Sequence, residues 1–180
     1  MKEVEMPSGK WAKRFAFVSV INLFIGIGWT ATFLFGGKYG LPDLHIGPVI
    51  SGGSAGMWFT MAYLMFLIVG VLGTLFFAAM YHLLPEIVGA DSTNELLSWL
   101  NFVLVNIGVW LASFVLGYWG YRAGVMQHVE GLETGEIHPW LVQIVDPMGV
   151  FIAITCLGML MGAINLTLAF RKKSRNQIKP

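Results

Sequence analysis

The residues of this chain best suited to metal or haem chemistry are its four histidines, His45, His82, His128 and His138. Imidazole is a common protein ligand of copper and of haem iron. His45 lies in a Gly/Pro-rich connection, residues 38–56, which we expect to form turns rather than regular structure. His128 and His138 lie in a second connection, residues 122–140, with three glutamates between them. Their spacing matches no metal motif, so we expect solvated side chains or subunit contacts, with a metal site at His45, His128 and His138 as the alternative.

His82 stands apart from the other three, at the opposite end of a hydrophobic segment. A haem held by two histidines needs both ligands at similar depth on facing helices, and His82 has no such partner. The single cysteine, Cys156, cannot form an intramolecular disulfide, and we expect it to pack as a small apolar residue. We therefore predict no catalytic residue, no haem and no metal ion for this chain by itself.

Four long hydrophobic segments must position these side chains, at about residues 13–36, 57–84, 96–121 and 147–170. Each is long enough for a helix to cross a hydrocarbon layer of about 30 Å, which takes ~20 residues. Only 12% of the residues are charged and 56% are hydrophobic, far from the balance of soluble domains. The sequence predicts an all-α protein, a four-transmembrane-helix bundle that forms a single domain over residues 1–180 and contacts bilayer lipid.

The positions of the basic residues predict the orientation of this bundle. Most of them lie before the first segment or after the last: Lys2, Lys10, Lys13, Arg14, Arg171, Lys172, Lys173, Arg175 and Lys179. Lysine and arginine stay on the cytoplasmic side, so we expect both termini to be cytoplasmic. The first segment is longer than the apolar core of a signal peptide, which makes it a retained span. No basic stripe interleaved with aromatic residues is present, so we do not expect nucleic acid to bind.

Turn and capping signals predict where the four helices begin and end. We expect the first helix to end at the Gly36-Gly37 pair and the second to end at Pro85. Ser92, three residues before Glu95, predicts a capping box at the start of the third helix. The Asp146-Pro147 pair predicts the start of the fourth helix, with the aspartate as its N-cap.

Polar and small side chains within the spans predict how the helices contact one another. Gly158 and Gly162 have the GxxxG spacing that allows close helix packing. We expect the polar side chains inside the spans to form hydrogen bonds between helices: Asn22, Thr30, Thr32, Asn101, Asn106, Ser113, Thr155, Asn165 and Thr167. The spans lack a charged pathway, which argues against a transporter.

Three stretches of the chain carry a resemblance to a known family: WFTMAYLMFLIVGVLGTLFFAAMYHLLP, LSWLNFVLVNIGVWLASFVLGYWGYRAG and HPWLVQIVDPMGVFIAITCLGMLMGAINLTLAF. In order, they resemble the second span, the third span and the loop with the fourth span of the catalytic subunit of haem–copper terminal oxidases. The class that includes the ba3 type is the most similar. The resemblance covers residues 57–175, about two-thirds of the chain.

The resemblance implies a truncated, ligand-free relative of that subunit. The second span of the family carries a haem-ligating histidine at the depth where this chain has Tyr63, Leu64 and Met65. The later spans of the family, which hold the copper ligands, have no counterpart here. The haem and copper are then expected in a partner subunit, and the chain is expected to be a multi-pass protein of a prokaryotic plasma membrane.

We therefore expect a non-catalytic accessory or structural subunit of a respiratory membrane complex, namely a haem–copper terminal oxidase. Its partners would be larger integral membrane subunits, and it could position lipid or quinone. One alternative is an accessory subunit of another multi-subunit membrane enzyme, such as a copper-dependent monooxygenase, which only the outer histidines support. Another is a small haem- or quinone-binding electron carrier, because aromatic side chains and one polar group can form a quinone site.

Overall fold

The protein is all-helical throughout the residues that the computed structural model describes, which are 9–39, 42–51, 55–88 and 93–177. Its helices follow in this order: α1 (Lys10–Phe35), α2 (Ile46–Ser51), α3 (Ala55–Met65), the π-helix η1 (Phe66–Gly73), α4 (Thr74–Val88), α5 (Glu95–His128), α6 (Thr134–Leu141), the 3₁₀-helix η2 (Val142–Ile144) and α7 (Val145–Gln177). No strand occurs in those ranges.

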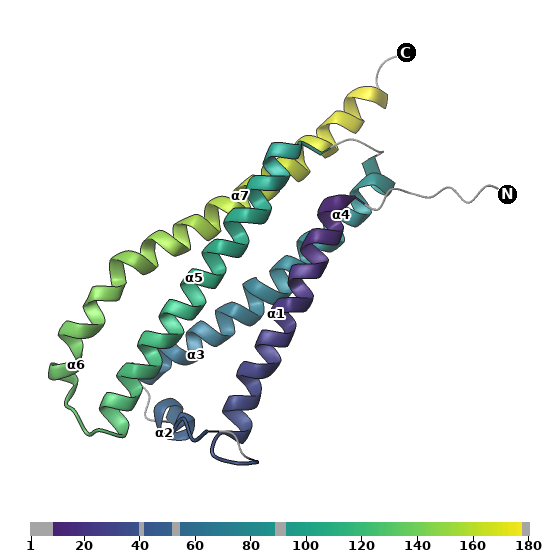
Figure 1. The fold of residues 1–180 in the computed structure, drawn as a ribbon. Coiled ribbons are helices and arrows are strands. Elements are labelled where there is room, and N and C mark those ends of the chain that lie inside the picture. The colour runs from purple at the N-terminus through teal and green to yellow at the C-terminus, as the bar shows by residue number, and fades with distance from the viewer. Residues whose placement is uncertain (1–8, 40–41, 52–54, 89–92, 178–180) are drawn as a thin grey trace.

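Four helical stretches are long and apolar enough to cross a membrane: Lys10–Phe35, Ala55–Val88, Glu95–His128 and Thr134–Arg171. The second consists of α3, η1 and α4, and the fourth of α6, η2 and most of α7. The prediction of a multi-pass, all-helical protein is thus confirmed. The start of α1 and the end of α7 lie at one end of the molecule, and α2 and α6 lie at the other (Figure 1). We call these the terminal end and the α2/α6 end; the membrane side of each stays a prediction.

Several helix ends differ from those predicted. α1 ends at Phe35, and Gly37 beyond it has φ +73°, as the glycine signal predicted. The second span continues past Pro85 to Val88, so the prediction that it ends at the proline was wrong. α5 continues through the expected loop to His128, because tertiary packing supports its last turns: its Gly124 lies against Val49 of α2.

The connections also contain more helix than predicted. Residues 46–51 of the first connection form α2, whose Ile46 and Val49 are buried against Phe59 of α3. In the second connection, α6 covers Thr134–Leu141 and leads without a break into α7, so the Asp146-Pro147 pair does not start a helix. The N-cap of α5 is Asn94, whose side chain accepts from the Leu97 N–H at 3.1 Å; the predicted cap Ser92 lies outside the described residues.

Helix α5 occupies the middle of the arrangement, with its most extensive contacts to α7 and α3, while α1 packs mainly on α4 and η1. The predicted close packing at the GxxxG spacing is confirmed. A Cβ atom at Gly158 would lie 2.6 Å from the backbone nitrogen of Val105, and one at Gly162 would overlap the amide of Asn101. Both glycines thus let α7 approach the backbone of α5.

The π-helix η1 lies in the middle of the second span, and side chains of α1 donate hydrogen bonds to two of its carbonyls. The amide of Asn22 donates to the Gly70 carbonyl at 2.5 Å, and the hydroxyl of Ser19 donates to the Val71 carbonyl at 3.2 Å. The Thr74 hydroxyl donates to both carbonyls from within the span. Since the hydrocarbon layer offers no water, these side chains supply hydrogen-bond donors to η1 carbonyls at that depth.

The prediction that polar side chains in the spans bond between helices is confirmed for only three of them. Asn22, Thr30 and Asn165 do so; the hydroxyl of Thr30 lies 2.7 Å from that of Tyr63. Four others donate to carbonyls of their own helix: Thr32, Asn106, Thr155 and Thr167. The buried side chains of Asn101 and Ser113 make no hydrogen bond to any described residue. For these two residues and for the four that bond within their own helix, the prediction was wrong.

Candidate functional site

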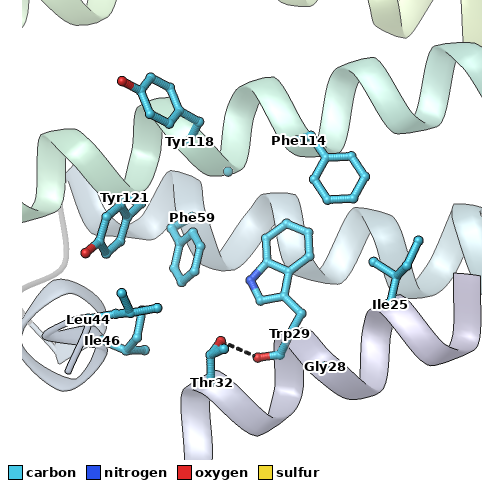
Figure 2. Close-up of a pocket in the computed structure, with 11 residues that line it drawn as sticks. Ile25, Gly28, Trp29, Thr32, Leu44, Ile46, Phe59, Phe114, Tyr118 and Tyr121 are labelled. Carbon is cyan, nitrogen blue, oxygen red and sulfur yellow. Dashed lines mark hydrogen bonds between the residues drawn. The ribbon is translucent and has the colours of Figure 1, made fainter. Parts of the chain in front are cut away.

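A cavity of about 420 Å³ lies between α1 and α5 near the α2/α6 end (Figure 2). α3 and the start of α2 close it on the far side. Its lining is almost wholly apolar and aromatic: Ile25, Gly28, Trp29, Thr32, Leu44, Ile46, Phe59, Phe114, Gly117, Tyr118 and Tyr121. No lining residue carries a charge at neutral pH, so the cavity is suited to a neutral, lipid-soluble molecule.

On each of the two helices, the lining residues follow a helical spacing that places them on one face of that helix. α1 contributes positions 25, 28, 29 and 32, and α5 contributes positions 114, 117, 118 and 121. Residues separated by three, four and seven positions share one face of a helix. A glycine at the second position of each set makes room: Gly28 has no atom within 4 Å of a built Cβ, and Gly117 lies directly against the Trp29 ring.

Ring contacts fix the aromatic walls. Trp29 stacks on Phe114, with centroids 5.8 Å apart and ring planes 15° from parallel. Trp29 also contacts Phe59, with centroids 5.7 Å apart, and Phe59 in turn contacts Tyr121 at 5.8 Å. Each such pair contributes roughly 0.5–1.5 kcal/mol beyond its buried area. The aromatic wall of the cavity is therefore already packed without a ligand.

The polar atoms at the cavity are few, and three of them have no partner among the described residues. The Thr32 hydroxyl donates to the Trp29 carbonyl at 2.7 Å, so its proton is occupied. The indole N–H of Trp29 and the hydroxyls of Tyr118 and Tyr121 make no hydrogen bond to any residue in the described part of the chain. Figure 2 shows the indole nitrogen on the edge of the ring that faces Phe59. A ligand that offers an oxygen acceptor there would satisfy it.

The three candidate metal-binding histidines lie in different local settings. His45 precedes α2 with φ +50°, and its Nδ1 lies 3.7 Å from the carboxylate of Asp43. His128 is the last residue of α5, and its Nε2 is buried without a hydrogen-bond partner among the described residues. His138 is on α6. Across the described ranges, no three His, Cys, Asp or Glu side chains are grouped so that they could hold one metal ion. A metal site here stays a prediction.

A second apolar cavity, of about 450 Å³, lies on the other side of α5, between α5 and the continuous α6–α7 stretch. His138, Trp119 and Gly149 are among its lining residues. Trp119 stacks on Trp140 of α6, with ring centroids 3.9 Å apart, which holds α6 against α5. The indole N–H groups of Trp58 and Trp119, which line this cavity, also make no hydrogen bond to a described residue, so the second cavity is a useful comparison for the first.

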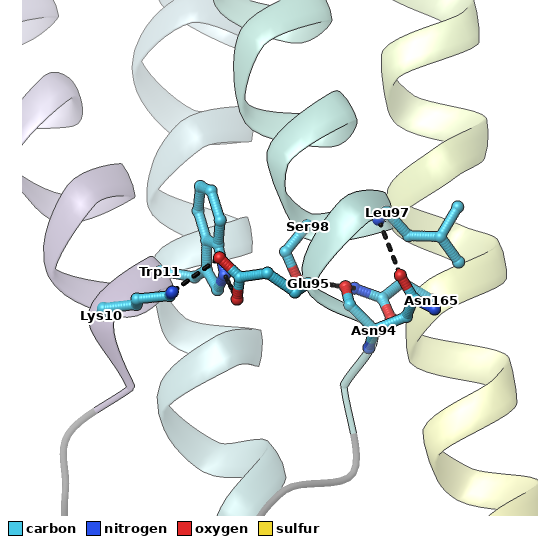
Figure 3. Close-up of polar contacts among 7 residues, drawn as sticks. All are labelled: Lys10, Trp11, Asn94, Glu95, Leu97, Ser98 and Asn165. Atoms are coloured by element: carbon cyan, nitrogen blue, oxygen red, sulfur yellow. Dashed lines mark hydrogen bonds and ion pairs between the residues drawn. The ribbon is translucent and has the colours of Figure 1, made fainter.

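A polar network joins the helices at the terminal end (Figure 3). The amide of Asn165 on α7 donates to the hydroxyls of Tyr81 at 3.1 Å and Ser98 at 2.8 Å, and its oxygen accepts from the Asn94 N–H at 2.8 Å. Glu95 pairs with Lys10 at 2.6 Å, and that exposed ion pair contributes little by itself. All these groups are satisfied within the chain, so the network is structural: it fastens α4, α5 and α7 together.

Asn165→Ala is expected to lower the free energy of unfolding by about 1 kcal/mol, because the hydrogen bonds it makes to α4 and α5 are lost together. Thr167→Ala is the matched control: its hydroxyl donates only to Ala163 of its own helix and is exposed. Thermal melting of both variants in detergent, followed by circular dichroism, measures the difference. Equal melting temperatures would contradict a stabilising role for the network.

The residues of the first cavity were not identified from the sequence, although a signal for them exists. The high aromatic content is evident from the sequence, but it does not show which aromatic residues lie together. Trp29 and Phe114 share a cavity because the faces of α1 and α5 that carry them point toward each other. The repeated three-and-four spacing of glycine and aromatic residues on both helices is that signal. No protein-family model matches the chain, and no curated protein or solved structure is significantly similar to it.

Proposed function

We propose that the protein is a non-catalytic accessory subunit of a respiratory membrane complex, a haem–copper terminal oxidase. The observation that carries this proposal is that hydrogen bonds join the helices inside the bundle, while exposed apolar side chains cover its outside. The interhelical hydrogen bonds of Asn22 and Asn165 tie the four spans to one another, while bulky apolar side chains face outward. Such a chain is suited to a structural role inside the membrane.

The outward faces of α1 and α7 both carry exposed apolar side chains, and we expect the larger partner to pack on that of α1. On α1, Phe17 and Phe24 are 68% and 70% exposed and lie two helical turns apart on one face. On α7, Leu157, Leu160 and Ile164 form a similar row. Aromatic residues are enriched at the centres of protein interfaces, which favours the α1 face for a partner and leaves the rest to lipid.

The choice of an oxidase as the partner rests on the resemblance of residues 57–175 to the second, third and fourth spans of its catalytic subunit. The partner would hold the haem and copper, and this chain would pack beside it in a prokaryotic plasma membrane. Its termini would be cytoplasmic, as the basic residues at both ends predict.

Purification of the tagged chain from its native membrane in mild detergent tests the proposal. Mass spectrometry should identify a haem–copper oxidase core in the same fraction, and a reduced-minus-oxidised spectrum should show haem. Recovery of the chain alone, without colour, would contradict the assignment.

A pair of bulky substitutions tests the docking face. Ile27→Trp enlarges the outward face of α1 and Leu160→Trp that of α7; both side chains are about half exposed. We expect Ile27→Trp to reduce partner recovery about ten-fold, a loss of ~1.4 kcal/mol of binding, and Leu160→Trp to leave it unchanged. Both purified chains should melt as the wild type does. Full recovery with Ile27→Trp would rule out docking through α1.

A further inference from the structure

We propose that the cavity between α1 and α5 binds the ring of an isoprenoid quinone. This inference does not depend on which complex the chain joins, because it concerns only residues of this chain. The cavity, of about 420 Å³, lies within the range of small-ligand sites and is bordered by three spans. Since spans form its walls, a ligand can enter from the hydrocarbon layer and leave a long apolar tail there.

The shape of the cavity is suited to a flat ring. Trp29, Phe114 and Phe59 form walls whose rings already contact one another, so a planar ligand can stack without reorganising them. The open position is Gly28, where a Cβ atom would meet no protein atom within 4 Å. Aromatic walls beside an unfilled glycine position favour a flat ring over a flexible acyl chain, which has no face to stack.

The polar groups of the cavity require an acceptor. The indole N–H of Trp29 has no hydrogen-bond partner among the described residues, and in a hydrocarbon layer no water replaces one. The ring of Phe59 is a much weaker acceptor than a carbonyl oxygen. The Tyr121 hydroxyl, also without a partner there, lies on the side of Leu44 and Ile46 (Figure 2). A quinone is flat, neutral and carries carbonyl oxygens on opposite edges of its ring, which suits both donors.

The experiment titrates the purified chain in detergent with menaquinone-4 and follows the quenching of tryptophan fluorescence. We expect saturable quenching for the wild type. Gly28→Leu should weaken binding by about ten-fold or more, because leucine fills the cavity. Gly149→Leu is the matched control: this helical glycine also has no atom within 4 Å of a built Cβ, but it lines the second cavity. It should bind as the wild type does.

A second pair of variants tests the hydrogen bond. Trp29→Phe keeps an aromatic wall and removes the N–H, and should weaken binding several-fold; Trp99→Phe makes the same change on an exposed residue outside the cavity and should have no effect on affinity. Because Trp29→Phe also removes a fluorophore, its affinity is taken from the midpoint of the titration. All four variants should retain the wild-type melting temperature.

Two outcomes of the titration would overturn the proposal. One is quenching that rises linearly in the wild type and equally in Gly28→Leu, which indicates partition into the micelle only. The other is a loss of affinity in Gly149→Leu but not in Gly28→Leu, which moves the site to the second cavity. Solvent extraction of the purified chain identifies the molecule that supplies the oxygen acceptor. Quinone recovered from the wild type and absent from Gly28→Leu supports the proposal. A phospholipid recovered from the wild type and absent from Gly28→Leu, without any quinone, contradicts it.

Discussion

Replacing Asn22 with leucine is expected to lower the free energy of unfolding by about 1–2 kcal/mol. A single interhelical hydrogen bond in a membrane protein contributes ~0.6 kcal/mol on average. Asn22 is fully buried and makes two: its amide donates to the Gly70 carbonyl of η1, and its oxygen accepts from the indole N–H of Trp110 at 2.9 Å. Leucine removes both and leaves the Trp110 N–H without an acceptor at membrane depth, which adds a desolvation cost.

Asn106→Leu is the matched control for this prediction. Asn106 is also an asparagine inside a span, but its amide donates only to the Phe102 carbonyl of its own helix, and its oxygen is buried without a partner. Its replacement should therefore leave stability unchanged or raise it slightly. Unfolding by sodium dodecyl sulfate in mixed micelles, followed by circular dichroism, measures both variants. A similar loss for the two would show that the interhelical bonds of Asn22 do not stabilise η1.

Hydropathy predicted the four spans because length and apolar content depend on local sequence alone. It could not predict η1, whose sequence FLIVGVLG is as apolar as any α-helical span. Two donors that reach its carbonyls, Ser19 and Asn22, are on another helix and lie far away in the sequence. The asparagine was recognised as a source of interhelical hydrogen bonds, but its partner was not, because spacing identifies a helix face and not what that face contacts.

The same limit explains the missed α2 and the missed cavity. Glycine and proline in residues 38–56 predict turns, yet Val49 is fully buried and its contacts with α3 and α5 support a short helix there. The faces that carry Trp29 and Phe114 are readable from the sequence as three-and-four repeats. These two faces line the same cavity because α1 and α5 diverge from each other where α3 lies beside them. That divergence depends on the packing of all the helices and not on local sequence.

Gly120→Ala is expected to lower the free energy of unfolding by about 1–3 kcal/mol, the range for overpacked sites. A Cβ atom at this position of α5 would lie 2.3 Å from the backbone nitrogen of Phe59 and 2.7 Å from the backbone carbon of Trp58. Backbone atoms cannot rotate away as a side chain can, so α3 and α5 must separate. Because Phe59 also forms a wall of the cavity, the variant should weaken menaquinone-4 binding as well.

Gly149→Ala separates this packing effect from the general effect of a methyl group on a helical glycine. A Cβ atom at Gly149 meets nothing within 4 Å, and alanine is the better helix former by about 1 kcal/mol, so stability should stay unchanged or rise. The micelle unfolding assay used for Asn22 compares the two alanine variants directly. If Gly120→Ala were as stable as Gly149→Ala, α3 and α5 could not pack as closely as the structure shows, and the wall that Phe59 forms would not be fixed. The stability of Gly120→Ala is thus a test of the cavity that does not require a ligand.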